Sequence, residues 1–138
     1  MKILVSACLL GENCRYKGDD CKNEKVLALK GQNELIAVCP EVLGGLPTPR
    51  APAEIVGDKV IANTGKDVTE NYKAGAEAAL CIARETKADY CIFKSKSPSC
   101  GCGEIYDGTF SGKLTAGNGI TAELFLKNGY AVKNENSL

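Results

Sequence analysis

Three short apolar runs, each leading into a cysteine, constrain the fold of this chain more than any other feature. The runs cover residues 2–7, 34–38 and 88–93, and the cysteines that follow them are Cys8, Cys39 and, after a short loop, Cys100. Such continuous apolar runs are typical of strands buried on both faces of a parallel sheet. Parallel strands end at the same edge, where open α/β sheets bind ligands, so the three cysteines are predicted to meet at one crevice.

Segments with helical signals alternate with these runs. We expect helices over residues 21–29, 65–86 and 120–127, and a final strand over residues 130–132. Thr64 with Asp67 is expected to cap the longest helix, and Asn118 the last one. The alternation predicts an α/β fold, a three-layer Rossmann-like or flavodoxin-like sandwich with a small, mainly parallel sheet, in which residues 1–138 form a single domain.

The remaining segments carry turn and loop signals. Residues 39–52 hold four of the five prolines and are expected to form a stiff extended loop, whereas residues 54–62 suit a small hairpin that turns at Gly57-Asp58. Residues 104–110 suggest a short extended piece, residues 112–119 a loop and residues 134–138 a frayed tail. Helical spacing predicts that the longest helix buries a stripe made of Val68, Tyr72, Ala76, Ala79 and Ala83.

The charge balance narrows the classes of partner. With 17 basic and 17 acidic residues the formal net charge is zero, so no basic field favours a nucleic-acid backbone, although local charge can hold a small anion. The few scattered aromatic residues argue against a base-stacking platform. No apolar run is long enough for a membrane span and no signal-peptide pattern precedes the first strand, so we expect a cytoplasmic protein.

The chain has eight cysteines and no histidine. In a reducing compartment, clustered thiols are better interpreted as metal ligands or catalytic groups than as disulfides. The lack of histidine excludes Ser-His and Cys-His nucleophiles and every His-containing zinc site. Three thiolates leave one coordination position open, which favours a catalytic zinc or iron–sulfur site. The alternative that spacing alone leaves open is that these cysteines are inert residues at strand ends.

The other five cysteines have weaker signals. Cys102 forms a C-x-C pair with the cysteine of the third run, so either could be the ligand there. Cys14 and Cys21 lie in a polar loop, where each could be a fourth ligand or an exposed bystander, and we favour bystanders. Cys81 and Cys91 fall inside a helix and a strand, and we expect both in the core because free cysteine is a common small core residue.

Polar residues near these strand ends complete the candidate site. Glu41 follows the second cysteine by two residues, and a carboxyl beside a metal pocket is a natural proton carrier. Ser97 and Ser99 either donate hydrogen bonds to a ligand or cap their own loop. The cations that suit a phosphate or carbonyl group, each of them individually more typical of solvated surface charge, are Arg15, Arg50, Lys94 and Lys96.

Taken together, the motifs resemble the thiouracil desulfidase family over nearly the whole chain. They are Ser6-Ala7-Cys8-Leu9-Leu10-Gly11, Cys14-Arg15-Tyr16, Cys39-Pro40-Glu41 with Gly44-Gly45-Leu46 and Pro49-Arg50, Lys96-Ser97-Pro98-Ser99-Cys100-Gly101, and Ile105-Tyr106-Asp107-Gly108-Thr109-Phe110. The Cys-Pro-Glu and Ser-Pro-Ser-Cys-Gly pieces are the most specific. Where many members have Tyr-Asp-Gly, this chain has Tyr16-Lys17-Gly18, and the added positive charge favours a phosphorylated substrate.

The resemblance implies an enzyme with a [4Fe-4S] cluster that Cys8, Cys39 and Cys100 hold, and with one iron that no protein residue binds. It implies that this iron takes the sulfur of a thiolated uracil or its nucleotide, such as thiouracil or 4-thio-UMP, and that hydrolysis releases sulfide. Glu41 and Ser97 match the positions expected to handle protons and orient the substrate. The candidate substrate-binding residues are Ser99, Arg15, Arg50 and Lys96.

Two alternatives remain beside this reading. One is a zinc- or thiol-containing module that binds a small molecule or nucleotide without turnover. The other is a small nucleotide-binding domain in which the cysteines are incidental. The expected partner is a small thiolated pyrimidine; neither a membrane nor a nucleic acid is expected, and no oligomeric state is indicated.

Overall fold

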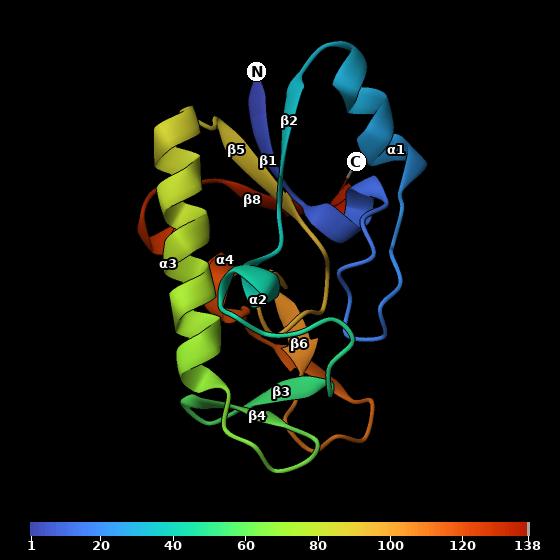
Figure 1. Ribbon diagram of the computed structural model, residues 1–138. Coiled ribbons are helices and arrows are strands. Elements are labelled where there is room, and N and C mark those ends of the chain that lie inside the picture. The colour runs from blue at the N-terminus through green and yellow to red at the C-terminus, as the bar shows by residue number, and fades with distance from the viewer. Residues whose placement is uncertain (138) are drawn as a thin grey trace.

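A central parallel sheet organises the computed structural model, which describes residues 1–137 (Figure 1). Its strands are β1 (Lys2–Ser6), β2 (Glu34–Val38), β5 (Tyr90–Phe93) and β8 (Val132–Asn134), in the spatial order β2-β1-β5-β8. All neighbouring strands run parallel, which confirms the predicted parallel sheet. The three runs that precede the cysteines are adjacent in it, with β1 between β2 and β5.

The sheet is covered on both faces. The α-helices are α1 (Glu24–Ala28), α2 (Pro40–Leu43), α3 (Thr69–Thr86) and α4 (Ile120–Lys127), and 3-10 turns span Ala7–Leu10, Leu29–Gly31 and Glu135–Ser137. None of the helices within residues 1–137 has the length and apolar character that crossing a membrane requires.

Alternating side chains of the strands build two separate cores. On one face, Leu4 and Phe93 pack with residues of α3 and with Phe125 of α4, whose ring meets that of Phe93 edge to face at 5.2 Å. On the other face, Ile3 packs with neighbours that include Val26 of α1. Burial on both faces explains why these strands have continuous apolar sequences. The predicted three-layer α/β sandwich is therefore confirmed.

Two hairpins lie beyond the carboxyl edge of the sheet, where Figure 1 shows β3, β4 and β6 grouped together. β3 (Ala53–Val56) pairs antiparallel with β4 (Lys59–Ala62), which confirms the predicted small hairpin. β6 (Glu104–Tyr106) pairs with β7 (Leu114–Ala116), so the prediction of a loop over residues 112–119 is wrong at its centre. All three residues of β7 are exposed, and no apolar alternation marked them as a strand.

The two longer predicted helices between the strands begin later than expected. α1 begins at Glu24 because the Asn23 Oδ1 atom accepts two backbone N–H groups of its first turn, at 3.0 and 3.1 Å. α3 begins at Thr69 and not at residue 65, because residues 63–66 form a turn that continues the β3–β4 hairpin. Of the two residues expected to cap this helix, Asp67 accepts the N–H of Thr69 at 2.9 Å, and Thr64 takes no part in this bond. Turn chemistry at the hairpin overrides the helical signal there.

Other helical predictions are confirmed in position but not always in capping. The predicted stripe of α3 is buried at every position: Val68, Tyr72, Ala76, Ala79 and Ala83. α4 has the predicted bounds, but Asn118 does not cap it. Its side chain accepts the N–H of Gly103 and donates to Glu123, both at 2.8 Å, and so ties the 103 loop to the helix.

The stretch after Cys39, predicted as an extended loop, begins with the short helix α2. Pro40 occupies its first position, where a missing backbone N–H leaves no hydrogen bond unmade. α2 packs directly on α3, because neither Gly44 nor Gly75 has a side chain to separate the two backbones. This contact fixes the place of Glu41 at the carboxyl edge of the sheet.

The C-terminal segment is ordered where a frayed tail was predicted, and the last strand lies at residues 132–134, two residues later than expected. Glu135 accepts hydrogen bonds from the N–H and Oγ of Ser95, at 2.8 and 3.0 Å, and its Oε2 lies 2.9 Å from the Nζ of Lys94. Burial opposes ionisation of this carboxyl, but the bonds from Lys94 and Ser95 outweigh that cost and hold the pKa of Glu135 below its usual value. Residue 138 lies outside the described residues.

Replacing Glu135 by glutamine is therefore expected to lower the free energy of unfolding at neutral pH by about 1–3 kcal/mol. Because the folded-state pKa of Glu135 is lowered, its contribution is fully present above the unfolded pKa of about 4.3 and is lost as the pH falls through the folded value. Urea unfolding of Glu135→Gln at neutral pH and in acid should show the difference shrinking. The exposed Glu77→Gln on α3 is the control, and an equal loss at both pH values would contradict the prediction.

Candidate active site

A cavity of about 470 Å³ lies at the carboxyl edge of the sheet, a size usual for small-molecule sites. Its walls come from the ends of β1 and β2, from α2, from the loop after β5 and from the two hairpins. Cys8, Cys39 and Cys100 all line it, so the predicted meeting of the three cysteines at one crevice is confirmed.

Two of these cysteines come directly after a strand, and the third follows the loop after β5. Cys8 lies in the 3-10 turn after β1, Cys39 stands at the N-cap of α2, and Cys100 follows the Ser97 turn after β5. Burial raises the pKa of the Cys100 thiol to about 12. A hydrogen bond with the Cys14 thiol, together with burial, raises the pKa of Cys39 well above its usual range. Metal binding would have to displace the protons that these thiols hold.

Cys14, expected to be a bystander, belongs to the same site. It lines the cavity, its carbonyl accepts a hydrogen bond from the Cys39 thiol at 3.9 Å, and its side chain lies beside those of Cys8 and Cys39. The cause is the tight turn over residues 11–13, in which the N–H of Glu12 returns to the carbonyl of Ala7 at 3.3 Å. A turn signal between two cysteines six residues apart was the sequence clue to this arrangement.

The other cysteines lie away from the cavity lining. The Cys102 thiol donates to the carbonyl of Val132 at 3.8 Å, so the choice that the C-x-C pair left open goes to Cys100 as the cysteine in the cavity. Cys21 is half-buried, and Cys91 is in the core as predicted. Cys81 is exposed, and its prediction as a core residue is wrong because it lies on the solvent side of α3. All eight cysteines, which fall within the described residues, are free thiols.

The three cysteines of the cavity are a donor set that an iron–sulfur cluster can use. Within residues 1–137, no three Cys, Asp or Glu side chains are arranged around one metal position. In an iron–sulfur cluster each thiolate binds a different iron, so the sulfur atoms need not converge on one point. Three cysteines on separate walls of one cavity fit that requirement.

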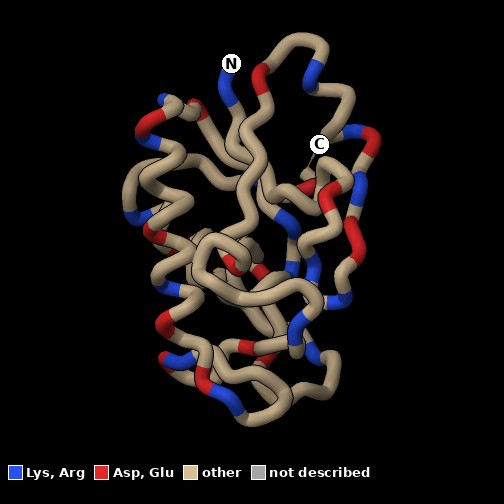
Figure 2. Tube along the Cα trace, in the orientation of Figure 1, with Lys and Arg blue, Asp and Glu red and all other residues tan. Residues whose placement is uncertain are grey.

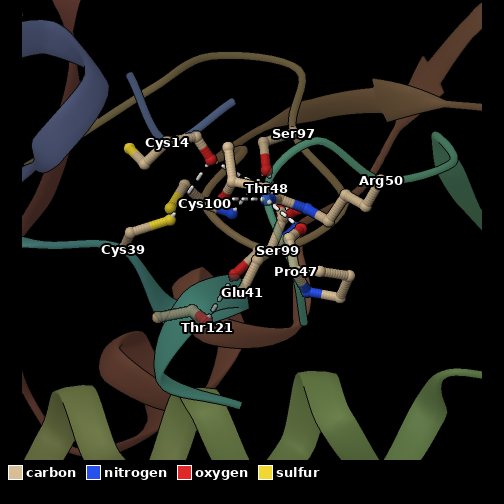
Figure 3. Close-up of polar contacts among 10 residues, drawn as sticks. All are labelled: Cys14, Cys39, Glu41, Pro47, Thr48, Arg50, Ser97, Ser99, Cys100 and Thr121. Atoms are coloured by element: carbon tan, nitrogen blue, oxygen red, sulfur yellow. Dashed lines mark hydrogen bonds and ion pairs between the residues drawn. The ribbon is translucent and has the colours of Figure 1, made fainter. Parts of the chain in front are cut away.

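Glu41 and Arg50 form a largely buried ion pair beside these thiols (Figure 3). The Oε2 atom of Glu41 lies 2.8 Å from Nε and 2.7 Å from Nη2 of Arg50, and the two side chains are 16% and 7% exposed. Nη2 also donates to the carbonyl of Cys14 at 2.9 Å, and Nη1 donates to Pro47 and Thr48. Every guanidinium nitrogen thus has an acceptor inside the protein. Arg50, predicted to bind substrate, lines the cavity, and its guanidinium is bound to Glu41 and to the carbonyl of Cys14.

The Ser-Pro-Ser-Cys loop presents one serine to the cavity and hides the other. The Ser97 Oγ accepts the N–H groups of Ser99 and Cys100, each at 3.0 Å, so its own hydrogen is left to donate. Ser97 lines the cavity. The Ser99 side chain is fully buried and pairs with Thr121 at 2.8 Å, so the structure does not bring it to the cavity as a substrate contact.

Of the four predicted cations, Arg15 and Lys96 remain for a ligand. All four line the cavity. Lys94 already forms an ion pair with Glu135, and Arg50 forms one with Glu41. Within residues 1–137, the one ion pair of Arg15 is with the exposed carboxylate of Asp19, at 3.3 Å, and Lys96 has none. The guanidinium of Arg15 also lies 5.6 Å from the centroid of the Tyr16 ring. Elsewhere, acidic and basic positions are interspersed along the chain (Figure 2).

Comparison with known proteins agrees with this geometry. A model of the family described as 2-thiouracil desulfurase matches residues 3–137. The chain belongs to this family of enzymes. This confirms the resemblance seen in the motifs and the expectation that the chain is an enzyme.

Two relatives of this desulfurase-family chain are close over their full length. The uncharacterized protein YbbK of Bacillus subtilis (strain 168) is 47% identical over 146 residues, which cover 99% of this chain and 97% of that protein. The solved structure of TudS, described as a [4Fe-4S]-dependent thiouracil desulfidase, matches with a TM-score of 0.93 and 44% identity. That match covers 99% of this chain and 92% of TudS, and it agrees with the α/β fold.

Proposed function

We propose that this chain is a [4Fe-4S]-dependent desulfidase that hydrolyses the carbon–sulfur bond of a thiolated uracil or its nucleotide. The observation that carries the proposal is that Cys8, Cys39 and Cys100 line one cavity together with Glu41 and Ser97. The family of the chain and the description of TudS support the same chemistry. The reaction exchanges sulfur for oxygen: water enters, a thiocarbonyl becomes a carbonyl, and sulfide leaves without net oxidation or reduction.

The three cysteines would hold the cluster, and one iron would have no protein ligand. When bound, such a group supplies a Lewis-acidic iron for the substrate sulfur. The chain itself supplies the neighbouring groups. Because Arg50 occupies Oε2 of Glu41, the Oε1 atom is the one left to accept a proton from the attacking water.

Ser97 is the proposed orienting residue. Its Oγ atom accepts hydrogen bonds from two backbone N–H groups. Its own hydroxyl hydrogen is therefore available to donate to a ligand. A carbonyl oxygen or ring nitrogen of a pyrimidine is a suitable acceptor. Arg15 and Lys96 would face the phosphate of a nucleotide substrate, in keeping with the extra charge at Lys17.

We further propose that residues 1–138 act as one desulfidase domain on a small molecule. Eight free thiols suit a reducing compartment, which supports a cytoplasmic location. The runner-up is a zinc- or thiol-containing binding module without turnover. Protein purified without oxygen separates the two, because a cluster gives a brown protein with bound iron and sulfide, whereas a zinc module is colourless.

The test is sulfide release from 2-thiouracil, 4-thiouracil and 4-thio-UMP by reconstituted protein under strict anaerobiosis. Glu41→Gln is expected to lower the rate by about 100- to 10,000-fold, because it keeps the shape of the side chain but removes the proton acceptor. Iron and sulfide content should be unchanged, and Glu77→Gln, at an exposed site on α3, should keep the full rate. A Glu41→Gln variant as fast as the wild type would reject the proton role.

A further inference from the structure

The fold gathers aromatic residues that the sequence scatters. Four of the eight aromatic side chains line the cavity: Tyr16, Tyr72, Tyr106 and Phe110. The scatter of these residues along the sequence argued against a stacking platform, but the fold brings four of them to one cavity. Tyr72 is 3% exposed and lies deep, whereas Tyr106 and Phe110 are 36% and 41% exposed and lie at the rim. The two rim residues have ring surface available to a ligand.

Phe110 occupies an unusual backbone conformation. Its φ angle is 56°, in the left-handed region that bulky residues rarely adopt and that costs a residue with a Cβ about 1–2 kcal/mol. The Phe110 side chain is not in the core, so core packing does not repay this cost. Strain held at the mouth of a cavity is a recognised mark of a functional position.

A dedicated carboxylate holds this loop in place. The Oε1 atom of Glu54, on β3, accepts the N–H of Gly108 at 3.0 Å and the N–H of Phe110 at 3.2 Å. Gly108 has φ 90° and lies so close to β3 that a Cβ there would be 2.6 Å from the carbonyl oxygen of Ile55. Asp107 fixes the same turn by accepting the N–H of Thr109 at 3.0 Å. These contacts tie the loop to β3 and place Phe110 at the rim.

The neighbours of this rim are polar and cationic. The backbone of Lys96, which has no ion pair within residues 1–137, forms a bridge with that of Ile105, the residue before Tyr106, so Lys96 is adjacent to the strand that carries Tyr106. Ser97, with its free donor, follows Lys96 on the same wall. Flat ring surface beside a hydrogen-bond donor and a cation is the combination that a nucleobase or its nucleotide needs.

We propose that Phe110 and Tyr106 form an aromatic wall that stacks on the pyrimidine ring of the substrate, with Glu54 as the residue that positions Phe110. The identity of the ring rests on the proposed function. The wall would orient the flat ring so that its sulfur points to the cysteines. It would also bind a planar ring more tightly than a puckered ring that carries the same carbonyl and N–H groups.

The experiment compares uracil with dihydrouracil, which keeps the carbonyl and N–H groups of uracil but is neither aromatic nor flat. Calorimetric titration of the reconstituted protein should show that uracil binds more tightly by about 5- to 100-fold, the range expected for one stacked base. Phe110→Leu, which keeps an apolar side chain without a ring, should remove most of this preference. It should also raise KM by a larger factor than it lowers kcat.

Two variants separate a stacking role from a general effect on folding. Tyr106→Leu should reduce the preference for uracil in the same direction. Tyr90→Leu, which removes an aromatic ring on β5 outside the cavity lining, should leave the preference as in the wild type. Glu54→Ala should weaken the preference although Glu54 has no ring, because its loss frees the Phe110 turn.

The outcomes distinguish this inference from the proposed function. Equal binding of uracil and dihydrouracil to the wild type, or a preference unchanged in Phe110→Leu, would overturn the aromatic wall even if sulfide is released from thiouracil. A preference that Phe110→Leu removes would support the wall even if none of the thiolated compounds is turned over. In that case only the proposed reaction would be rejected.

Discussion

Replacing Cys39 by serine is expected to abolish cluster binding, reducing iron and acid-labile sulfide to the background of the reconstitution. Cys39 is the one thiol supplied from the N-cap of α2, and no other cysteine reaches the cavity from that wall. Two thiols would remain of the proposed three, and a serine hydroxyl is a much poorer iron ligand than a thiolate. Visible absorbance and metal analysis measure the loss before any assay of turnover.

Matched cysteine variants make this prediction sharp. Cys102→Ser should keep the cluster, because that thiol faces the carbonyl of Val132 and does not line the cavity. Cys14→Ser should also keep it if the ligand set is as proposed, although Cys14 contacts two of the proposed ligands. Full iron content in Cys39→Ser would contradict the assignment, and iron loss in Cys14→Ser would add a fourth thiol to the ligand set.

Gly75→Ala is expected to destabilise the protein by at least about 3 kcal/mol, although alanine is the better residue in the interior of an ordinary helix by about 0.5–1 kcal/mol. A Cβ at Gly75 would overlap the carbonyl oxygen of Pro40 and approach the N–H of Gly44 at 3.2 Å. These are backbone atoms that no side-chain rotation can move aside. The contact between α2 and α3 would have to open, and Glu41 would move with α2.

Chemical unfolding measures whether alanine at position 75 lowers the free energy of unfolding, as expected here, or raises it, as in the interior of an ordinary helix. Gly31→Ala is the matched control, because a Cβ there meets nothing within 4 Å and the residue does not need a positive φ. It should change the free energy of unfolding by less than about 0.5 kcal/mol. A Gly75→Ala variant as stable as the wild type would show that the two backbones separate without cost.

The placement of α2, Cys14 and Arg50 shows what sequence patterns miss. Cys14 is held by a local backbone turn and by a hydrogen bond from the guanidinium of Arg50 to its carbonyl. Arg50 lies 36 residues away in the sequence. The sequence predicted Arg50 as a substrate-binding cation, and only the fold shows that it is surrounded by acceptors of the protein. Ser97 and Ser99 are alike in sequence, but the loop turns one to the cavity and the other to Thr121.

The sequence by itself determined the parallel sheet, the buried stripe of α3 and the meeting of three cysteines at one edge. The reason is that burial on two faces leaves continuous apolar runs, and parallel strands necessarily end together. The tertiary structure alone decided which polar groups face the cavity and how the aromatic rim is built. Glu54 and Phe110 are 56 residues apart, and no local pattern encodes a hydrogen bond between them, because such pairs form only once separate hairpins pack at the same edge.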